Sequence, residues 1–159
     1  MYHIDEAAES LVHVVLPDMS APHPRQALSH LAKMTGPYIS VDTRIIEQRL
    51  FVLEQQEGSG IGNGVALPHL RLSGADRAIA FFARNRPWLN FHTVDNTLVD
   101  LICCLVSPVD TAAAHLRRLS RITRVLRNNT TLDMLRAAEN RNVIEMILTS
   151  NYPGQFHAA

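Results

Sequence analysis

The residues with the clearest chemical potential lie in one short segment, where a run of glycines leads to His69. Four of the chain's seven glycines occupy alternate positions from Gly58 to Gly64, directly before Val65-Ala66-Leu67-Pro68-His69. This much backbone freedom costs entropy on folding, which favours a loop that must approach another group closely. Its amides could form a nest for an anionic oxygen. A neutral imidazole at position 69 is a nucleophile near pH 7.

The glycine run does not match the common nucleotide-binding loops. A P-loop needs a lysine followed by serine or threonine, but the only lysine of the chain is Lys33. A dinucleotide fingerprint needs its glycines between a strand and a following helix, whereas these precede a strand-like run and Pro68. The proline fixes its own φ and favours an extended Leu67, so we expect His69 to be presented at the end of a strand.

The string from Ser59 to His69 resembles the active-site signature of the mannitol/fructose-type enzyme IIA domains of the bacterial phosphotransferase system. The resemblance covers about residues 10 to 150 and is strongest to the stand-alone nitrogen-regulatory members. Further matches follow in the family's order: Pro87, Phe91, Asp95-Asn96, Val99-Asp100-Leu101, Pro108, and His115-Leu116 with Leu119.

The resemblance implies that His69 accepts a phosphoryl group from the phosphohistidine of a small carrier protein, NPr or HPr. His115 matches the second histidine of the family, which would bond the phosphoryl oxygens or set the tautomer of His69. The resemblance implies no cofactor and no metal. It also implies a protein that carries a phosphoryl group from one partner to another rather than an enzyme with catalytic turnover. The expected phosphate-binding residues are Ser59, Gly60, Gly62, Asn63 and Gly64.

One departure from the family leaves alternatives open. Leu53, before Glu54, stands where the family usually has an arginine, the natural clamp for a phosphate. Arg71 keeps a cation near the histidine. The leading hypothesis is a regulatory phosphocarrier; the alternatives are a sugar-specific enzyme IIA that serves a separate IIB, and a degenerate module that no longer transfers. Metal-dependent hydrolysis by His69 and His115 is disfavoured, because neither has a carboxylate or cysteine at ligand spacing.

Composition restricts the class of protein. The 159 residues are 47% hydrophobic, and 15 basic residues balance 15 acidic ones, which argues against an electrostatic nucleic-acid binder. Adjacent Cys103 and Cys104 look like core residues, so a reducing cytoplasm is expected. We find no apolar run of 18 residues and no signal-peptide plan, which predicts no membrane insertion. The arginines that follow Asp110 predict a solvated helix face or a docking stripe for an acidic partner.

The remaining elements must position the glycine segment. We expect a strand over 12–16, a helix from Pro24 ended by Gly36-Pro37, and a helix capped by Asp42 that buries Ile45, Ile46, Leu50 and Leu53. Strand-like apolar runs cover 64–68, 78–83 and 98–106, and the last two are apolar on both faces. Three helices follow, capped by Asp110, by Thr130 or Thr131, and by an Asn142-x-x-Glu145 box.

This order of elements predicts an α/β fold with a mixed sheet flanked by helices on both faces. Residues 1–150 form a single domain in this interpretation, and 151–159 form a flexible tail.

Overall fold

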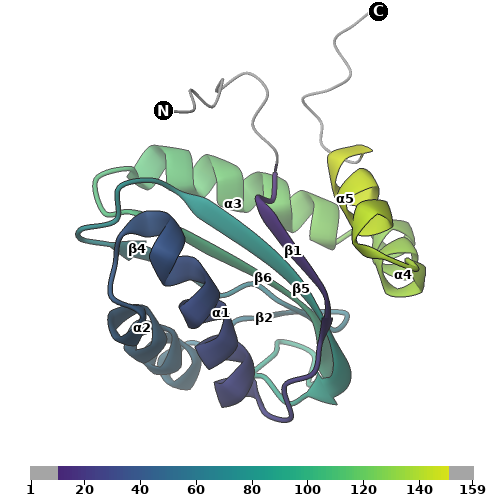
Figure 1. The fold of residues 1–159 in the computed structure, drawn as a ribbon. Coiled ribbons are helices and arrows are strands. Elements are labelled where there is room, and N and C mark those ends of the chain that lie inside the picture. Colours follow the sequence, from purple (N-terminus) through teal and green to yellow (C-terminus); the bar gives the residue numbers. More distant parts are fainter. Residues whose placement is uncertain (1–10, 151–159) are drawn as a thin grey trace, which may run out of the picture.

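A six-stranded mixed sheet separates two groups of helices in the computed structural model, which describes residues 11–150 (Figure 1). The sheet has the order β1-β5-β6-β3-β2, and β4 also pairs with β6. Within residues 11–150, no helix is long and apolar enough to span a membrane. The predicted 151–159 tail lies outside the described residues. The elements are β1 (Val14–Met19), α1 (Pro24–Ile39), α2 (Thr43–Gln56), β2 (Gly60–Gly62), β3 (Val65–Ala66), β4 (His69–Leu72), β5 (Ile79–Leu89), β6 (Val99–Pro108), α3 (Ala112–Leu126), α4 (Asn129–Ala137) and α5 (Arg141–Ser150).

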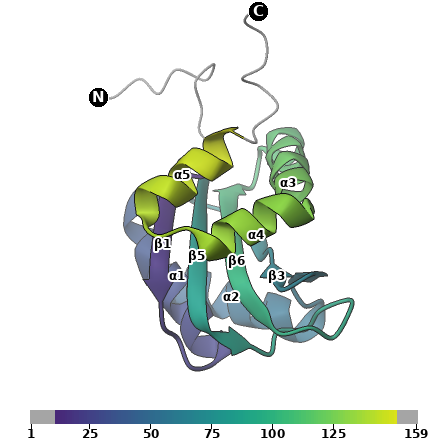
Figure 2. The ribbon, with the colours of Figure 1, turned by 90° about the vertical axis from the view of Figure 1, so that its right-hand side faces the viewer.

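The two central strands carry the core on both of their faces, because successive side chains point to opposite sides. Phe81 packs in the cluster beneath α1 and α2, whereas Phe82 packs in the cluster beneath α3, α4 and α5. Figure 2 shows α4 and α5 covering one face of the sheet, with α1 and α2 behind it. Cys103 and Cys104 are fully buried in opposite clusters, and burial raises the pKa of both thiols. The predicted fold class and the predicted core cysteines are confirmed.

Two predictions about strands and helix ends were wrong. His69 does not end a strand but begins β4, which runs parallel to β6. Helix α1 does not stop at Gly36-Pro37 but continues to Ile39, which is fully buried. A proline in the last turn removes one backbone hydrogen bond, and the burial of Ile39 offsets that loss.

Helix caps were predicted with mixed success. Asp42 does cap α2, since its carboxylate accepts a hydrogen bond from the Arg44 amide at 2.9 Å. The N-cap of α3 is Thr111 instead of Asp110. Asn128 Oδ1 accepts from the Thr131 amide, and Asn140 Oδ1 accepts from the Val143 amide, so these asparagines replace the predicted caps. Each lies just outside the helix, where its side chain can reach a free amide.

The burial pattern of α2 also differs from the prediction. Ile45 is 51% exposed, although its spacing suggested burial. The buried positions are Ile46, Leu50 and Glu54, a stripe repeating every four residues. Leu53 is partly buried against the core beneath α1 and α2. A carboxylate therefore faces the interior beside the glycine segment.

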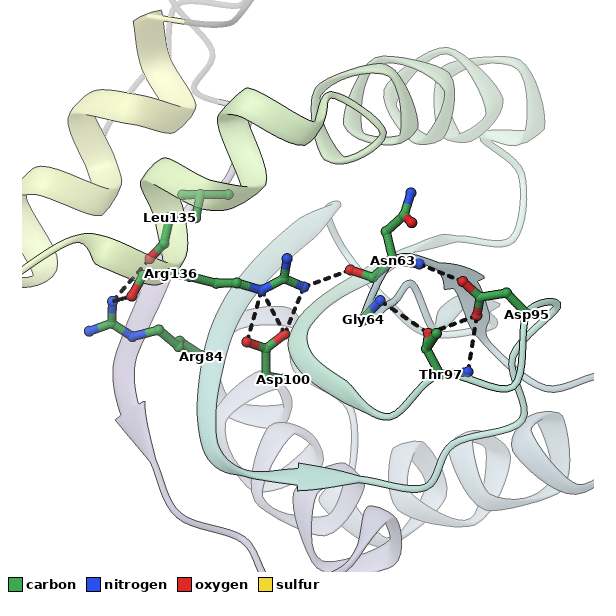
Figure 3. Close-up of polar contacts among 8 residues, drawn as sticks. All are labelled: Asn63, Gly64, Arg84, Asp95, Thr97, Asp100, Leu135 and Arg136. Atoms are coloured by element: carbon green, nitrogen blue, oxygen red, sulfur yellow. Dashed lines mark hydrogen bonds and ion pairs between the residues drawn. The ribbon is translucent and has the colours of Figure 1, made fainter.

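Arg84 of β5 joins α4 to the sheet through hydrogen bonds (Figure 3). Its Nη1 donates hydrogen bonds to the carbonyl oxygens of Leu135, Arg136 and Ala138 at 3.0, 3.3 and 2.7 Å, and its Nε donates to Pro17 O at 3.0 Å. The last carbonyls of a helix have no partner within the helix, and a cation there also complements the helix dipole. Arg84 thus binds the end of α4 and the strand β1 together.

We expect Arg84→Ala to lower the free energy of unfolding by about 2–4 kcal/mol, because it leaves several partly buried carbonyls without a donor. Arg86→Ala is the matched control: its side chain is 75% exposed and pairs only with Asp18 among the described contacts. Loss of such a surface pair costs less than about 1 kcal/mol. Urea denaturation followed by Trp88 fluorescence measures both, and equal losses would contradict the role of Arg84.

Candidate functional site

Two histidine side chains meet at one edge of the sheet. His69 Nδ1 lies 3.2 Å from His115 Nε2, and the ring centroids are 5.4 Å apart with an angle of 44° between the ring planes. On its other side, His115 Nδ1 lies 2.8 Å from Ser107 Oγ. His69 is half-buried, whereas His115 is only 5% exposed. The structure therefore brings together the two histidines that the sequence singles out, 46 residues apart.

Strand pairing fixes both ends of this chain of contacts. His69 is the Cα partner of Leu105 in the parallel ladder between β4 and β6, and the Leu105 amide donates to Pro68 O at 3.1 Å. Ser107 follows two residues later on β6 and thus points to the same face as Leu105. His115 lies one turn into α3, where its amide donates to Thr111 O at 2.9 Å. Both rings are held by regular secondary structure.

Both imidazoles favour the neutral form. Burial lowers the pKa of His69, and the charge of Glu57 opposes this effect in part. Burial also lowers the pKa of His115, to about 4, with further contributions from His69 and from the positive charge of Arg71. A neutral imidazole keeps one ring nitrogen free of a proton. At pH 7 the pair therefore has a lone pair available for nucleophilic attack.

The glycine segment forms a tight hairpin between β2 and β3. Asn63 and Gly64 both have positive φ, at 56° and 79°, as expected for the two central residues of a type I′ turn. A Cβ at position 64 would also collide with Arg136 Nη2 and approach Trp88. Glycine is favoured there by the positive φ, and a larger residue would also displace the end of the Arg136 side chain.

Side chains from three segments hold the tip of this hairpin (Figure 3). The Asn63 amide donates to Asp95 Oδ2 at 2.9 Å, and the Gly64 amide donates to Thr97 Oγ1 at 3.4 Å. From α4, Arg136 Nη2 donates to Asn63 O at 2.6 Å and also binds the Asp100 carboxylate. The hydrogen bond from the Asn63 amide and those from Thr97 lower the pKa of Asp95 to about 2.

Glu54 anchors the base of the hairpin. Ser59 Oγ donates to Glu54 Oε2, and the His92 amide donates to Glu54 Oε1 at 3.0 Å. The Gly60 amide donates to His92 O at 2.9 Å. Glu54 is 8% exposed, so the segment that precedes His69 is tied to α2 from inside the protein.

These hydrogen bonds already use the donors of most residues that were predicted to bind phosphate. The amides of Gly60, Asn63 and Gly64 and the hydroxyl of Ser59 all donate to acceptors within the protein. Phosphate binding by these residues and by Gly62 stays a prediction, and it would require these hydrogen bonds to be exchanged.

Several residues of the site are not singled out by their own sequence context. Ser107 ends a long apolar strand, and Glu54 sits in a polar helix, so neither position has a distinguishing pattern. Arg71 shares a face of β4 with His69, and its Nη1 donates to Val109 O at 3.0 Å. Its positive charge contributes to the lowered pKa of His115.

The lowered pKa of His115 predicts a pH dependence of stability. Unfolded histidine has a pKa near 6.5, so the unfolded state binds more protons than the folded state between pH 6.5 and about 4. The free energy of unfolding should therefore fall as the pH falls through this window, by at most about 1.4 kcal/mol per pH unit for each such histidine.

Urea titrations between pH 5 and 6.5 measure this slope above the range in which Asp95 titrates. His115→Gln is the control and should reduce the slope, and the part that remains comes from His69, whose pKa burial also lowers. NMR of the imidazole rings gives a direct reading, in which the His115 resonances stay those of a neutral ring down to pH 5. A His115 titration midpoint near 6.5 would contradict the structure.

A profile for the family described as "Phosphoenolpyruvate-dependent sugar phosphotransferase system, EIIA 2" matches residues 9–151. The chain is 32% identical to a nitrogen regulatory protein of Bradyrhizobium diazoefficiens, over 84% of this chain and 88% of that protein. It is 29% identical to a nitrogen regulatory protein of Escherichia coli K12, over 79% and 77% of the two chains.

Solved structures show the same architecture. The crystal structure of nitrogen regulatory protein IIA-Ntr from Neisseria meningitidis superposes with a TM-score of 0.81 at 27% identity, covering 87% of this chain and 94% of that one. IIA mannitol from Escherichia coli shares the fold with a TM-score of 0.69 at 13% identity, over 84% and 94% of the chains. The profile covers nearly the whole chain, and the relatives and the fold agree with it: this chain belongs to the type 2 enzyme IIA family of the phosphoenolpyruvate-dependent sugar phosphotransferase system.

Proposed function

We propose that this protein is a cytoplasmic phosphocarrier of the nitrogen-related phosphotransferase system, which accepts a phosphoryl group on His69 and regulates partner proteins through its phosphorylation state. The observation that carries the proposal is the pairing of a half-buried, neutral His69 with a buried His115 at 3.2 Å. The similarity to nitrogen regulatory proteins favours the nitrogen branch over the sugar branch.

Proton placement selects the reacting atom of His69. Two arrangements satisfy the contacts among Ser107, His115 and His69. In one, His115 donates from Nδ1 to Ser107 Oγ and accepts at Nε2 from His69 Nδ1–H; in the other, every donor is reversed. Only the first leaves a lone pair on His69 Nε2. That nitrogen makes no hydrogen bond among the described contacts, so we assign it as the nucleophile.

The transfer step then needs little from the protein beyond positioning. His69 Nε2 forms a bond to the phosphorus of the donor's phosphohistidine, and the bond between phosphorus and the donor nitrogen breaks. The donor imidazole keeps the electron pair of that bond. Positive charge develops on the His69 ring, and His115 Nε2 stabilises it by accepting the hydrogen bond from Nδ1–H, as the orienting partner does in a catalytic triad.

Arg71 supplies a cation beside the transferred group in this proposal. It lies on the same face of β4 as His69, and its positive charge contributes to the lowered pKa of His115. A guanidinium binds phosphoryl oxygens in a bidentate geometry. Leu53 packs against the core and carries no charge, so Arg71 would take the part that the family's usual arginine takes.

Incubation with phosphorylated NPr tests the proposal directly. We expect acid-labile labelling of the wild-type protein and none of His69→Ala. His115→Ala should retain the nucleophile but react about 100-fold more slowly, because it loses the group that orients and stabilises the ring. Labelling of His69→Ala at the wild-type level would refute the assignment. A faster reaction with phosphorylated HPr would favour a sugar-specific enzyme IIA.

The leucine at position 53 favours a second candidate, a binding module that has kept the fold but lost efficient transfer. Two substitutions separate the candidates. If Arg71 provides the cation, Arg71→Gln slows labelling by about tenfold and Leu53→Arg changes it by less than about twofold. The degenerate module predicts the reverse, with sharply faster labelling of Leu53→Arg. Circular dichroism of each variant controls for folding.

A further inference from the structure

The Ser107 hydroxyl lies at the buried end of the histidine pair. Ser107 is 1% exposed, and its Oγ lies 2.8 Å from His115 Nδ1. Within residues 11–150, neither of these two atoms has another hydrogen-bond partner. The opposite nitrogen of the same ring, His115 Nε2, contacts His69. Ser107 is therefore linked to His69 through a single imidazole.

The surrounding chain fixes the Ser107 hydroxyl relative to the His115 ring. Pro108 favours an extended backbone at Ser107, which is the Cα partner of Arg71 in the ladder between β4 and β6. A tight turn then leads into α3, because the Thr111 amide and hydroxyl both donate to Pro108 O, at 3.2 and 2.8 Å. The His115 amide donates in turn to Thr111 O. The contact between the hydroxyl and the ring is thus set by the strand, the turn and the first turn of the helix.

A hydroxyl can donate or accept, and the choice at Ser107 passes through His115 to His69. When Ser107 Oγ accepts from His115 Nδ1–H, His115 Nε2 carries no proton and accepts from His69 Nδ1–H. His69 Nε2 then keeps its lone pair. When Ser107 donates instead, His115 Nε2–H donates to His69 Nδ1, and the proton of His69 lies on Nε2. Only the first arrangement leaves His69 Nε2 able to attack.

We propose that Ser107 is a positioning residue for phosphoryl transfer: by accepting a hydrogen bond from His115, it stabilises the proton arrangement in which His69 Nε2 is the nucleophile. This inference rests on the proposed function of His69. Ser107 acts through His115, since its hydroxyl contacts His115 Nδ1 and not His69. It takes the place of the third, orienting group in a chain of nucleophile, partner and orienting acceptor.

Burial makes the acceptor at position 107 decisive. His115 is only 5% exposed, so without the hydroxyl a proton on Nδ1 would be a buried donor without a partner. Buried N–H groups without a partner are rarer than acceptors without one. The proton would therefore lie on His115 Nε2, from which it can donate to His69 Nδ1. Loss of the hydroxyl thus favours the arrangement in which His69 cannot attack.

A pocket beside His115 allows the Ser107 hydroxyl to accept without losing its own donor. Ser107 and His115 both line this pocket, which lies between the start of α3, the start of β5 and the end of β6 and has a volume of about 530 Å³. Solvent in the pocket can accept the hydroxyl hydrogen while Oγ accepts from His115 Nδ1–H. The acceptor role therefore leaves no polar group of Ser107 unsatisfied.

The same hydrogen bond acts during the transfer step. As the bond from His69 Nε2 to phosphorus forms and the bond from phosphorus to the donor nitrogen breaks, positive charge develops on the His69 ring. The proton stays on His69 Nδ1, and His115 Nε2 accepts its hydrogen bond. Hydrogen bonds in a chain polarise one another, so donation from His115 Nδ1 to Ser107 Oγ makes His115 Nε2 a stronger acceptor.

Nitrogen-15 NMR of the imidazole rings, recorded on the unphosphorylated protein at about pH 7, tests the proton arrangement without a donor protein. We expect the Nδ1–H tautomer at both His69 and His115 in the wild type, and the Nε2–H tautomer at both in Ser107→Ala. Ser107→Thr keeps a hydroxyl and should restore the wild-type tautomers. Wild-type rings in the Nε2–H form, or wild-type tautomers in Ser107→Ala, overturn the proposal.

Thr35→Val is the matched control for loss of a buried hydroxyl. Thr35 is fully buried in α1, and its Oγ1 donates to Leu31 O at 2.7 Å. The substitution removes this hydroxyl with little change in side-chain volume and touches neither histidine, so both tautomers should stay those of the wild type. A change of tautomer in Thr35→Val as large as that in Ser107→Ala would mean that general loosening of the core, and not Ser107, moves the protons.

Labelling by phosphorylated NPr tests the consequence for transfer. Ser107→Ala should slow the labelling of His69 by about tenfold or more, whereas Ser107→Thr and Thr35→Val should stay within about threefold of the wild type. Circular dichroism confirms that each variant is folded. Equal rates for Ser107→Ala and the wild type overturn the proposal. If the tautomers follow residue 107 but the wild type is never labelled, the proposed function of His69 fails and the placement of the protons by Ser107 stands.

Discussion

The pairing of β6 with its neighbours is the constraint on which the rest of the structure depends. This strand is buried along nearly its whole length and pairs with β3, β4 and β5. Asp100, near its start, binds the arginine of α4 that holds the glycine hairpin. Ser107, near its end, holds His115. One continuous strand therefore sets the positions of His69, His115 and the glycine hairpin.

Burial and hydrogen bonding have separate effects on the histidine pair: burial sets the charge, and hydrogen bonding sets which nitrogen carries the proton. Burial keeps both rings neutral, because an imidazolium loses hydration energy in a low-dielectric environment. The contacts with Ser107 and His115 restrict which nitrogen of His69 carries the proton. Neither effect alone would leave a nucleophilic nitrogen in a fixed direction. The pair is thus neutral and fixed in orientation, as the proposed transfer requires.

Arginines serve different purposes in the interior and at the surface. Arg84 and Arg136 use their guanidinium groups to join helix α4 to the sheet and to the hairpin. The arginines of α3 instead line the pocket beside His115 or face solvent. The net charge of zero does not reveal this arrangement, because composition gives the number of charged residues and not their positions in the fold.

The sequence by itself determined the layered α/β fold and singled out His69 and His115, which the structure brings together. Apolar runs over 78–83 and 98–106 reveal buried strands directly, and a dense glycine motif is a local signal. Tertiary structure alone decided the short strands β2 and β4, the continuation of α1 through Pro37, and the parts played by Glu54, Ser107 and Arg136. These features depend on partners distant in the chain, and no local pattern records which carboxylate, hydroxyl or guanidinium will meet which backbone group.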